Sequence, residues 1–337
     1  MLSALRRWAK SLFARLSRLP GRAAGGGSKW LYRSFSHTVD PQAPGRARQV
    51  ELTYRLYLPA GRRRRESLPL LVMLHGCRQN SRDFAVGTRM NELAEQHKFA
   101  VLYPEQSSKA NAYHCWNWYD AAVLKGGGEA GALVAMIGEV ARRRGVDPAR
   151  IYVAGMSAGG AMARVLAVTN ARVFAACAVH SGLMYRAATN AMQAMRAMRD
   201  GARVSPGETL QSLPLSGASA RGFVPTLVIH GDRDDVVNSR NAQLIVAQSL
   251  GMMPPADADA EPTVETTTQP ADETDRSYTV RDYRRHGTTL LRSISVAGLG
   301  HAWSGGRPQL PFNDRLGPSS SELVWQFASQ HRREDTA

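Results

Sequence analysis

Cysteine is scarce in this chain of 337 residues, which contains only Cys77, Cys115 and Cys177. Three thiols allow one disulfide at most, and none stands in a C-x-x-C or Cys/His zinc spacing. The sequence therefore excludes a disulfide scaffold and indicates no metal site. Long apolar runs are also missing, since no segment approaches the roughly 18 uninterrupted apolar residues of a membrane-spanning helix.

Acidic residues are scarce at the N-terminal end. Residues 1–65 hold 15 of the 43 Lys and Arg but only Asp40 and Glu51 as acids, so they carry +13 of the formal charge of +15. The rest of the chain is almost neutral, with 28 bases against 26 acids. A dedicated nucleic-acid binder needs basic residues clustered on its folded body, so this balance argues against nucleic acid as a partner.

Residues 2–19 are predicted to form an amphipathic basic helix, because leucine and tryptophan recur every three or four residues and five cations fill other positions. Such a helix suits an anionic or apolar surface. A solvated leader that orders only in part is the alternative. Charges interrupt the apolar run that a secretory signal needs. Three glycines at 25–27 separate this segment from the body of the chain, so residues 1–47 are interpreted as a basic extension and linker.

Short apolar runs alternate with helical patterns in the body of the chain, residues 48–331. Strands are predicted at 50–59, 68–76, 99–104, 151–155, 174–182 and 224–231, with a strand pair at 278–285 and 289–297. Helices are predicted around 87–97 and at 129–144, 158–168, 238–250 and 319–331. This alternation predicts an α/β fold with a mostly parallel central sheet flanked by helices.

Three segments fall outside the alternation. Residues 183–222 are rich in Ala, Met and Ser, which indicates a cap-like excursion over the active face. Residues 251–275 contain four prolines and seven acids but no Lys or Arg, so a mobile acidic loop is expected there. Residues 332–337 form a short C-terminal tail.

A candidate nucleophile stands between a predicted strand and a predicted helix. The segment GMSAG at 155–159 is a G-x-S-x-G pattern in that context, which pushes Ser157 into a sharp, exposed turn. The next helix directs its positive end toward the serine, which favours a developing oxyanion. A structural turn is the alternative interpretation.

A nucleophilic serine needs a base and an orienting carboxylate, and both occur downstream in the order typical of hydrolases. The segment HGDRDD ends a buried strand, and we predict Asp234 as the acid. Asp232 and Asp235 are interpreted as turn formers or caps of the next helix. His301, between Gly300 and Ala302, is the predicted base.

The predicted oxyanion hole consists of two backbone N–H groups, those of Cys77 and Ala158. Cys77 closes the first buried strand, and Ala158 is the residue after the nucleophile. The Cys77 thiol itself has three interpretations: core filler, disulfide partner or catalytic thiol, the last disfavoured because Ser157 fills that place.

Three tryptophans near these motifs are candidate pocket residues. Trp303 is expected to line the cleft, while Trp116 and Trp118 fit either the pocket wall or ordinary core packing.

Six motifs together resemble one known family: HGCRQ at 75–79, YPEQ at 103–106, CWNWY at 115–119, GMSAGG at 155–160, HGDRDDVV at 230–237 and GHAWSGG at 300–306. The sequence resembles the esterases of the poly(3-hydroxybutyrate) depolymerase family, relatives of secreted feruloyl and acetyl-xylan esterases, over residues 48–330. The resemblance implies an α/β-hydrolase fold, ester hydrolysis without a cofactor, a location outside the cytoplasm, and the same Ser157, Asp234 and His301.

The resemblance also implies a disulfide between Cys77 and Cys115. A second bridge found in relatives is absent here, because Ala187 and Ala197 stand at its positions. The binding domain that usually accompanies attack on crystalline polymer is not visible. The leading hypothesis is therefore a serine carboxylesterase acting on short-chain hydroxyacyl or aryl esters, with polyhydroxyalkanoate as a less favoured substrate. The alternatives are a serine peptidase of similar fold and a binding protein on a hydrolase scaffold that docks to a membrane or polyester granule through residues 2–19.

Overall fold

The computed structural model describes residues 27–39, 48–61, 66–211, 222–253 and 261–333. The amphipathic pattern at 2–19 lies outside the described residues. So do parts of the predicted excursion and acidic loop, at 212–221 and 254–260, and the end of the C-terminal tail.

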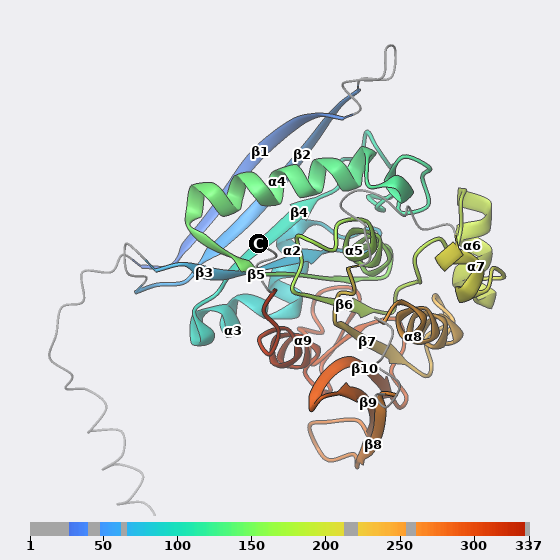
Figure 1. The fold of residues 1–337 in the computed structure, drawn as a ribbon. Coiled ribbons are helices and arrows are strands. Elements are labelled where there is room, and N and C mark those ends of the chain that lie inside the picture. The colour runs from blue at the N-terminus through green and yellow to red at the C-terminus, as the bar shows by residue number, and fades with distance from the viewer. Residues whose placement is uncertain (1–26, 40–47, 62–65, 212–221, 254–260, 334–337) are drawn as a thin grey trace, which may run out of the picture.

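Ten strands of the described residues form one sheet in the order β1-β2-β4-β3-β5-β6-β7-β10-β9-β8 (Figure 1). Its six central strands run parallel, while β1, β2, β8 and β9 pair antiparallel at the two edges. The bounds are β1 Lys29–Val39, β2 Arg48–Leu58, β3 Leu68–Leu74, β4 Ala100–Glu105, β5 Val146–Met156, β6 Ala176–His180, β7 Thr226–Gly231, β8 Thr263–Gln269, β9 Tyr278–Arg285 and β10 Thr288–Val296. The mostly parallel sheet predicted from the sequence is confirmed.

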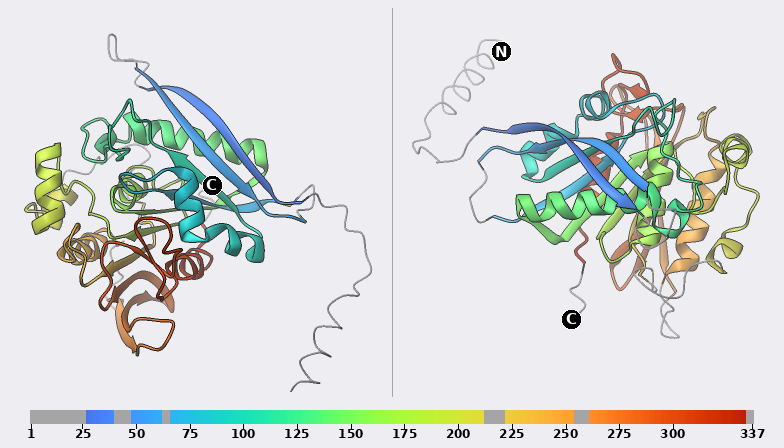
Figure 2. Two further views of the ribbon diagram at one scale, coloured as in Figure 1. Left: turned by 180° about the vertical axis from the view of Figure 1, so that it is seen from behind. Right: turned by 90° about the horizontal axis from the view of Figure 1, so that it is seen from above.

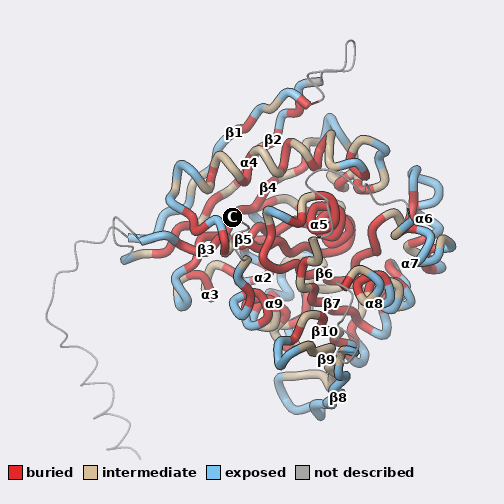
Figure 3. The backbone as a smooth tube through the Cα atoms, in the orientation of Figure 1, coloured by how far each residue is buried: buried red, intermediate tan, exposed pale blue. Residues whose placement is uncertain are grey.

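Helices cover both faces of the sheet, and alternate residues of a central strand enter separate cores. In β3, Leu70, Val72 and Leu74 belong to one core, while Leu71 and Met73 belong to the other. The first core is completed by α4 (Gly128–Arg144), α5 (Ala158–Thr169) and α8 (Arg240–Met252), and the second by α2 (Ser81–Thr88), α3 (Met90–His97) and α9 (Ser320–Ala328). Burial is therefore densest along the central strands and α5 (Figure 3).

Residues 29–39 belong to the folded domain, so the predicted boundary at residue 48 is wrong. Strand β1 pairs with β2 along its full length, from Lys29 opposite Leu58 to Val39 opposite Arg48. Figure 2 shows this pair at one edge of the sheet. The side chains of Phe35 and Val39 are buried, which ties the segment to the domain.

The acidic stretch is also more ordered than expected. Residues 263–269 form the edge strand β8, so the prediction of a mobile loop is wrong there. Its β-branched sequence TVETTTQ suits an extended chain, and its side chains find partners on β9. Glu265 lies 3.3 Å from Arg284, and the hydroxyls of Thr268 and Thr279 lie 3.2 Å apart.

The described part of the excursion after β6 contains two helices, α6 (Ala191–Asp200) and α7 (Pro206–Gln211). The Asn190 side chain caps α6 by accepting a hydrogen bond from the Gln193 N–H. Short pieces complete the described fold: a 3₁₀ turn η1 (Val123–Lys125) and the pair β11 (Trp303–Ser304) and β12 (Asn313–Asp314). Among the described helices, none has both the length and the apolar character needed to cross a bilayer.

Candidate active site

Ser157 lies at the sharp turn between β5 and α5, where its backbone has φ 56° and ψ −122°. Such a conformation is strained for a residue with a side chain. The neighbouring glycines make room for it. A Cβ atom on Gly159 would lie 2.1 Å from the Leu74 carbonyl oxygen, and one on Gly155 would lie 2.3 Å from the Gly159 carbonyl oxygen. The G-x-S-x-G sequence is therefore what this turn requires.

His301 and Asp234 come together from loops at the ends of β10 and β7. The Nδ1 atom of His301 lies 2.8 Å and 3.0 Å from the two carboxylate oxygens of Asp234. The carboxylate also accepts hydrogen bonds from the N–H groups of Val236, at 3.0 Å, and Val237, at 2.8 Å. The Asp234 side chain is fully buried behind the imidazole. This arrangement fixes the orientation of the His301 ring.

The ionised form of Asp234 is strongly favoured. Burial alone would raise the pKa of this carboxyl, but hydrogen bonds from His230 and His301, together with the Val237 N–H, hold the pKa far below its usual value. The acid is therefore charged beneath the imidazole near neutral pH. Asp232 does not reach His301; its carboxylate accepts a hydrogen bond from the Gly298 N–H at 2.7 Å.

Ser157 and His301 line the same cavity, which has a volume of about 450 Å³. Both residues line the cavity in this structure, and no hydrogen bond joins their side chains. Ser157 is only 6% exposed, so a reacting group reaches it through the cavity rather than from open solvent. Within the described ranges, no cluster of three or more His, Cys, Asp or Glu side chains is placed to bind a metal ion.

Of the two residues predicted to supply oxyanion donors, Ala158 follows the nucleophile directly and Cys77 lines the same cavity. Ala158 is the first residue of α5, so its N–H has no acceptor within the helix. Gly76, the residue before Cys77, lies close to the serine, because a Cβ atom on it would lie 3.4 Å from the Ser157 Cβ. The Gln79 side chain holds this loop by accepting a hydrogen bond from the Gly76 N–H at 2.8 Å.

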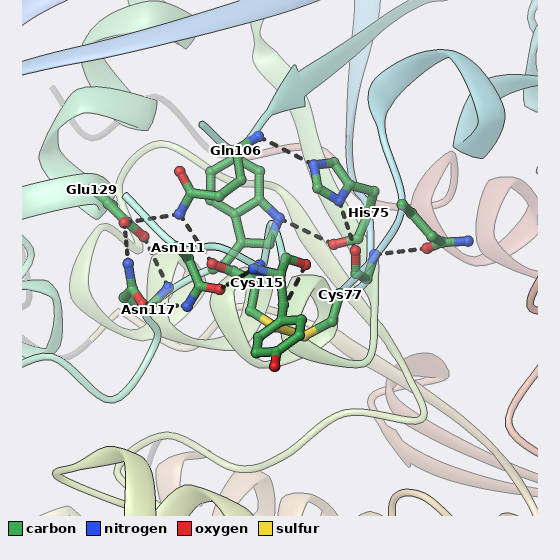
Figure 4. The surroundings of a disulfide bond; sticks show 11 residues. His75, Cys77, Gln106, Asn111, Cys115, Asn117 and Glu129 are labelled. Atoms are coloured by element: carbon green, nitrogen blue, oxygen red, sulfur yellow. Dashed lines mark hydrogen bonds between the residues drawn. A yellow bond between two sulfur atoms is a disulfide. The ribbon is translucent and has the colours of Figure 1, made fainter. Parts of the chain in front are cut away.

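A disulfide joins Cys77 to Cys115, as the resemblance implied (Figure 4). The loop that carries Cys115 is anchored on the buried Glu129 of α4. That carboxylate accepts hydrogen bonds from the Gln106 side chain, at 2.8 Å, and from the side chain and backbone of Asn117. The YPEQ and CWNWY motifs thus supply residues that hold the partner loop of the disulfide, a role that sequence reasoning missed.

His75 connects the two loops from inside. Its Nδ1 atom donates to the Gly76 carbonyl at 2.8 Å, and its Nε2 atom accepts from the Gln106 N–H at 3.2 Å. The second bond needs the neutral ring, because a protonated Nε2 cannot accept, and burial lowers the pKa of His75 to about 4. The Trp116 indole N–H donates to the His75 carbonyl at 3.0 Å. The loop over Ser157 is therefore fixed from below by an uncharged imidazole and an indole.

None of the three candidate tryptophans lines this cavity, so their assignment to the pocket wall is corrected. Trp116, Trp118 and Trp303 are 0%, 2% and 1% exposed, and all pack in the cores. The Trp303 indole N–H donates to the Ser321 hydroxyl at 3.1 Å, and its ring stacks on His180. The wall is instead formed by other apolar side chains: Tyr113, Met156, Met195, Met198, Val236 and Phe312. Two of these methionines come from α6, so the excursion does reach the active face.

The parallel sheet, the strained serine after β5, and the later aspartate and histidine define an α/β-hydrolase. The chain belongs to the esterase PHB depolymerase family, whose family model matches residues 52–269.

Similar proteins include poly(3-hydroxyalkanoate) depolymerase C of Paucimonas lemoignei, which is 32% identical over 69% of this chain and 54% of that protein. Feruloyl esterase B of Neurospora crassa is 36% identical over 34% of this chain and 39% of its own. The chain thus spans about half the length of the first relative and less of the second. An acetyl xylan esterase structure from Aspergillus awamori is similar in fold, with a TM-score of 0.64 at 18% identity over 88% of this chain and 99% of that one.

Proposed function

We propose that this protein is a serine carboxylesterase that hydrolyses short-chain hydroxyacyl or aryl esters. The observation that carries the proposal is the shared cavity of Ser157 and His301, with Asp234 bonded to the far side of the imidazole. Membership of the esterase family and relatives named as depolymerase and feruloyl esterase support the same reaction class.

The proposed reaction begins when Ser157 Oγ attacks the ester carbonyl carbon while His301 accepts the hydroxyl proton. Asp234 stabilises the imidazolium that forms, and the N–H groups of Cys77 and Ala158 bind the developing oxyanion. The acyl carbon–oxygen bond then breaks, and the alcohol leaves with the proton from His301. Water, activated by the same histidine, releases the acid from Ser157 and restores the enzyme.

The cavity supports small esters as substrates. A volume of about 450 Å³ suits an acyl or aryl group of modest size, and methionine, valine and aromatic side chains form most of its wall. Flexible methionines on α6 adapt to groups of different shape. Soluble esters are therefore proposed as substrates ahead of solid polymer.

Replacing the nucleophile tests the proposal. Ser157→Ala should lower turnover of short-chain chromogenic esters by at least ~10³-fold and abolish labelling by a fluorophosphonate probe. Ser108→Ala, at an exposed serine outside the cavity, is the matched control and should keep both properties. A Ser157→Ala protein that retains more than about a tenth of the rate would refute the assignment. Failure of the unaltered protein to react with ester or probe would favour the binding-protein alternative.

We also propose, from sequence pattern alone, that residues 2–19 attach the protein to an anionic lipid surface. A protein lacking residues 1–26 keeps all of β1, so it should hydrolyse a small soluble ester within about twofold of the full chain. It should no longer sediment with anionic vesicles at low salt. Equal sedimentation of the two proteins would contradict this attachment.

A further inference from the structure

One permanent charge stands on the otherwise apolar wall of the active-site cavity. Arg78 is the only Lys, Arg, Asp or Glu among the described residues that line it. The ion pairs found among the described residues do not include Arg78. Arg78 therefore lines the same cavity as the nucleophile, and no Asp or Glu among the described residues lines it.

Arg78 is an exposed residue whose backbone and guanidinium both contact Tyr113. Its backbone has a left-handed φ of 61°, and its N–H donates to the Tyr113 carbonyl at 2.7 Å. Its guanidinium lies over the ring of the same tyrosine, 5.4 Å from the ring centroid. The disulfide between Cys77 and Cys115 ties together the two loops that carry these residues. The contact with the Tyr113 ring gives the exposed guanidinium a preferred position, so part of its freedom is lost before a ligand binds.

We propose that Arg78 binds a carboxylate of the substrate, and that the enzyme prefers esters whose alcohol portion carries a free carboxylate, as in short linear oligomers of a hydroxy acid. In such an oligomer the terminal ester bond joins an acyl group to the hydroxyl of a unit that ends in a carboxylate. This inference rests on the proposed ester hydrolysis at Ser157. Arg78 comes directly after Cys77, a proposed oxyanion donor. A substrate carboxylate bound to Arg78 would therefore lie close to the ester carbonyl that Ser157 attacks.

The chemistry of the two groups supports this pairing. A guanidinium presents a planar fork of N–H donors that matches the two oxygens of a carboxylate. Apolar residues such as Met195 and Phe312 line the same cavity, but Arg78 itself is exposed, so the ion pair would form in contact with solvent and would weaken as salt screens it.

The experiment compares two substrates of the same length: the dimer of 3-hydroxybutyrate as free acid, and its methyl ester. The measured quantity is kcat/KM for the acid divided by kcat/KM for the methyl ester. Arg78→Gln should lower this ratio by about tenfold, because a charge-assisted hydrogen bond is lost, and Arg78→Lys should lower it less. Arg82→Gln removes an exposed cation of α2 that does not line the cavity, and it should leave the ratio unchanged.

Three results would overturn the inference. An unchanged ratio in Arg78→Gln means that the residue does not recognise the carboxylate. Equal losses on both substrates mean that Arg78 acts on the reaction itself. An equal fall in the ratio for Arg82→Gln means that long-range attraction, not binding at Arg78, favours the acid. Failure of the proposed function is recognised separately, because the unaltered protein would then hydrolyse neither substrate.

Discussion

Acid should destabilise this domain through His75, which is buried as a neutral imidazole beneath the loop over Ser157. Its two ring nitrogens are engaged by the Gly76 carbonyl and the Gln106 N–H. Protonation would place a second N–H opposite the Gln106 N–H, where no acceptor is available to it. The folded protein therefore resists protonation of this ring, and the unfolded chain does not.

The magnitude is set by the two pKa values. In the unfolded chain the imidazole titrates near its ordinary value of 6.5, whereas burial lowers the pKa of His75 to about 4 in the folded protein. The stabilisation is complete above the unfolded value and is lost as the pH falls toward the folded value. One pKa unit corresponds to about 1.4 kcal/mol, so the free energy of unfolding should fall by about 3 kcal/mol over this interval.

The assay is urea unfolding of the unaltered protein and His75→Gln at several pH values between about 7.5 and 4. Burial also lowers the pKa of His180, to about 3, and of His331, to about 4, so both proteins should lose stability in acid. The variant should be less stable near neutrality, and the difference between the two proteins should shrink by about 3 kcal/mol as the pH falls. A difference that stays constant with pH would refute the reasoning. The exposed His286, changed to Gln, serves as the control and should not alter the slope.

Three further predictions concern the site. Asp234→Asn should reduce kcat by about 10⁴-fold in the same ester assay, and Asp232→Asn should reduce it far less. Equal losses in the two variants would mean that Asp234 is not the orienting carboxylate. Replacing Cys77 and Cys115 with alanine opens a loop of 38 residues and should lower the free energy of unfolding by about 4 kcal/mol in urea titrations. Three free thiols in the purified, unaltered protein would disprove the disulfide. Trp116→Phe leaves the His75 carbonyl without its indole donor and should cost about 1–3 kcal/mol in the same titrations; unaltered stability would contradict that role.

The central strands and the elbow at Ser157 could be predicted because their signals are local. An all-apolar run such as 68–74 has few interpretations, and the glycines at 155 and 159 are demanded by backbone contacts within one turn. Strand β1 was missed because only Phe35 and Val39 of its residues are buried. Its alternation is therefore weak, and it lies in the strongly basic part of the chain. Strand β8 was missed because its side chains are all exposed, so no apolar pattern marks it.

The tryptophans could not be placed from the sequence, because their partners are distant along the chain. The indole of Trp116 bonds a carbonyl 41 residues away, and that of Trp303 bonds a hydroxyl 18 residues away. An aromatic residue near a catalytic motif fits a pocket and a core equally well until such a partner is known. The choice of Asp234 among three acids rests on its distance from the end of β7, and the structure brings that residue to His301.

The disulfide also closes residues 77–115 into a covalent ring within the chain. Residues 77–115 include α2, α3 and β4, and β4 lies between β2 and β3 in the sheet. When force is applied at the two termini of the oxidised protein, tension passes across the sulfur–sulfur bond and never reaches the ring. The fully stretched molecule should then be shorter by about 130 Å than its reduced form, at about 3.5 Å per residue. The measured length of a single stretched molecule therefore shows whether its disulfide is oxidised or reduced.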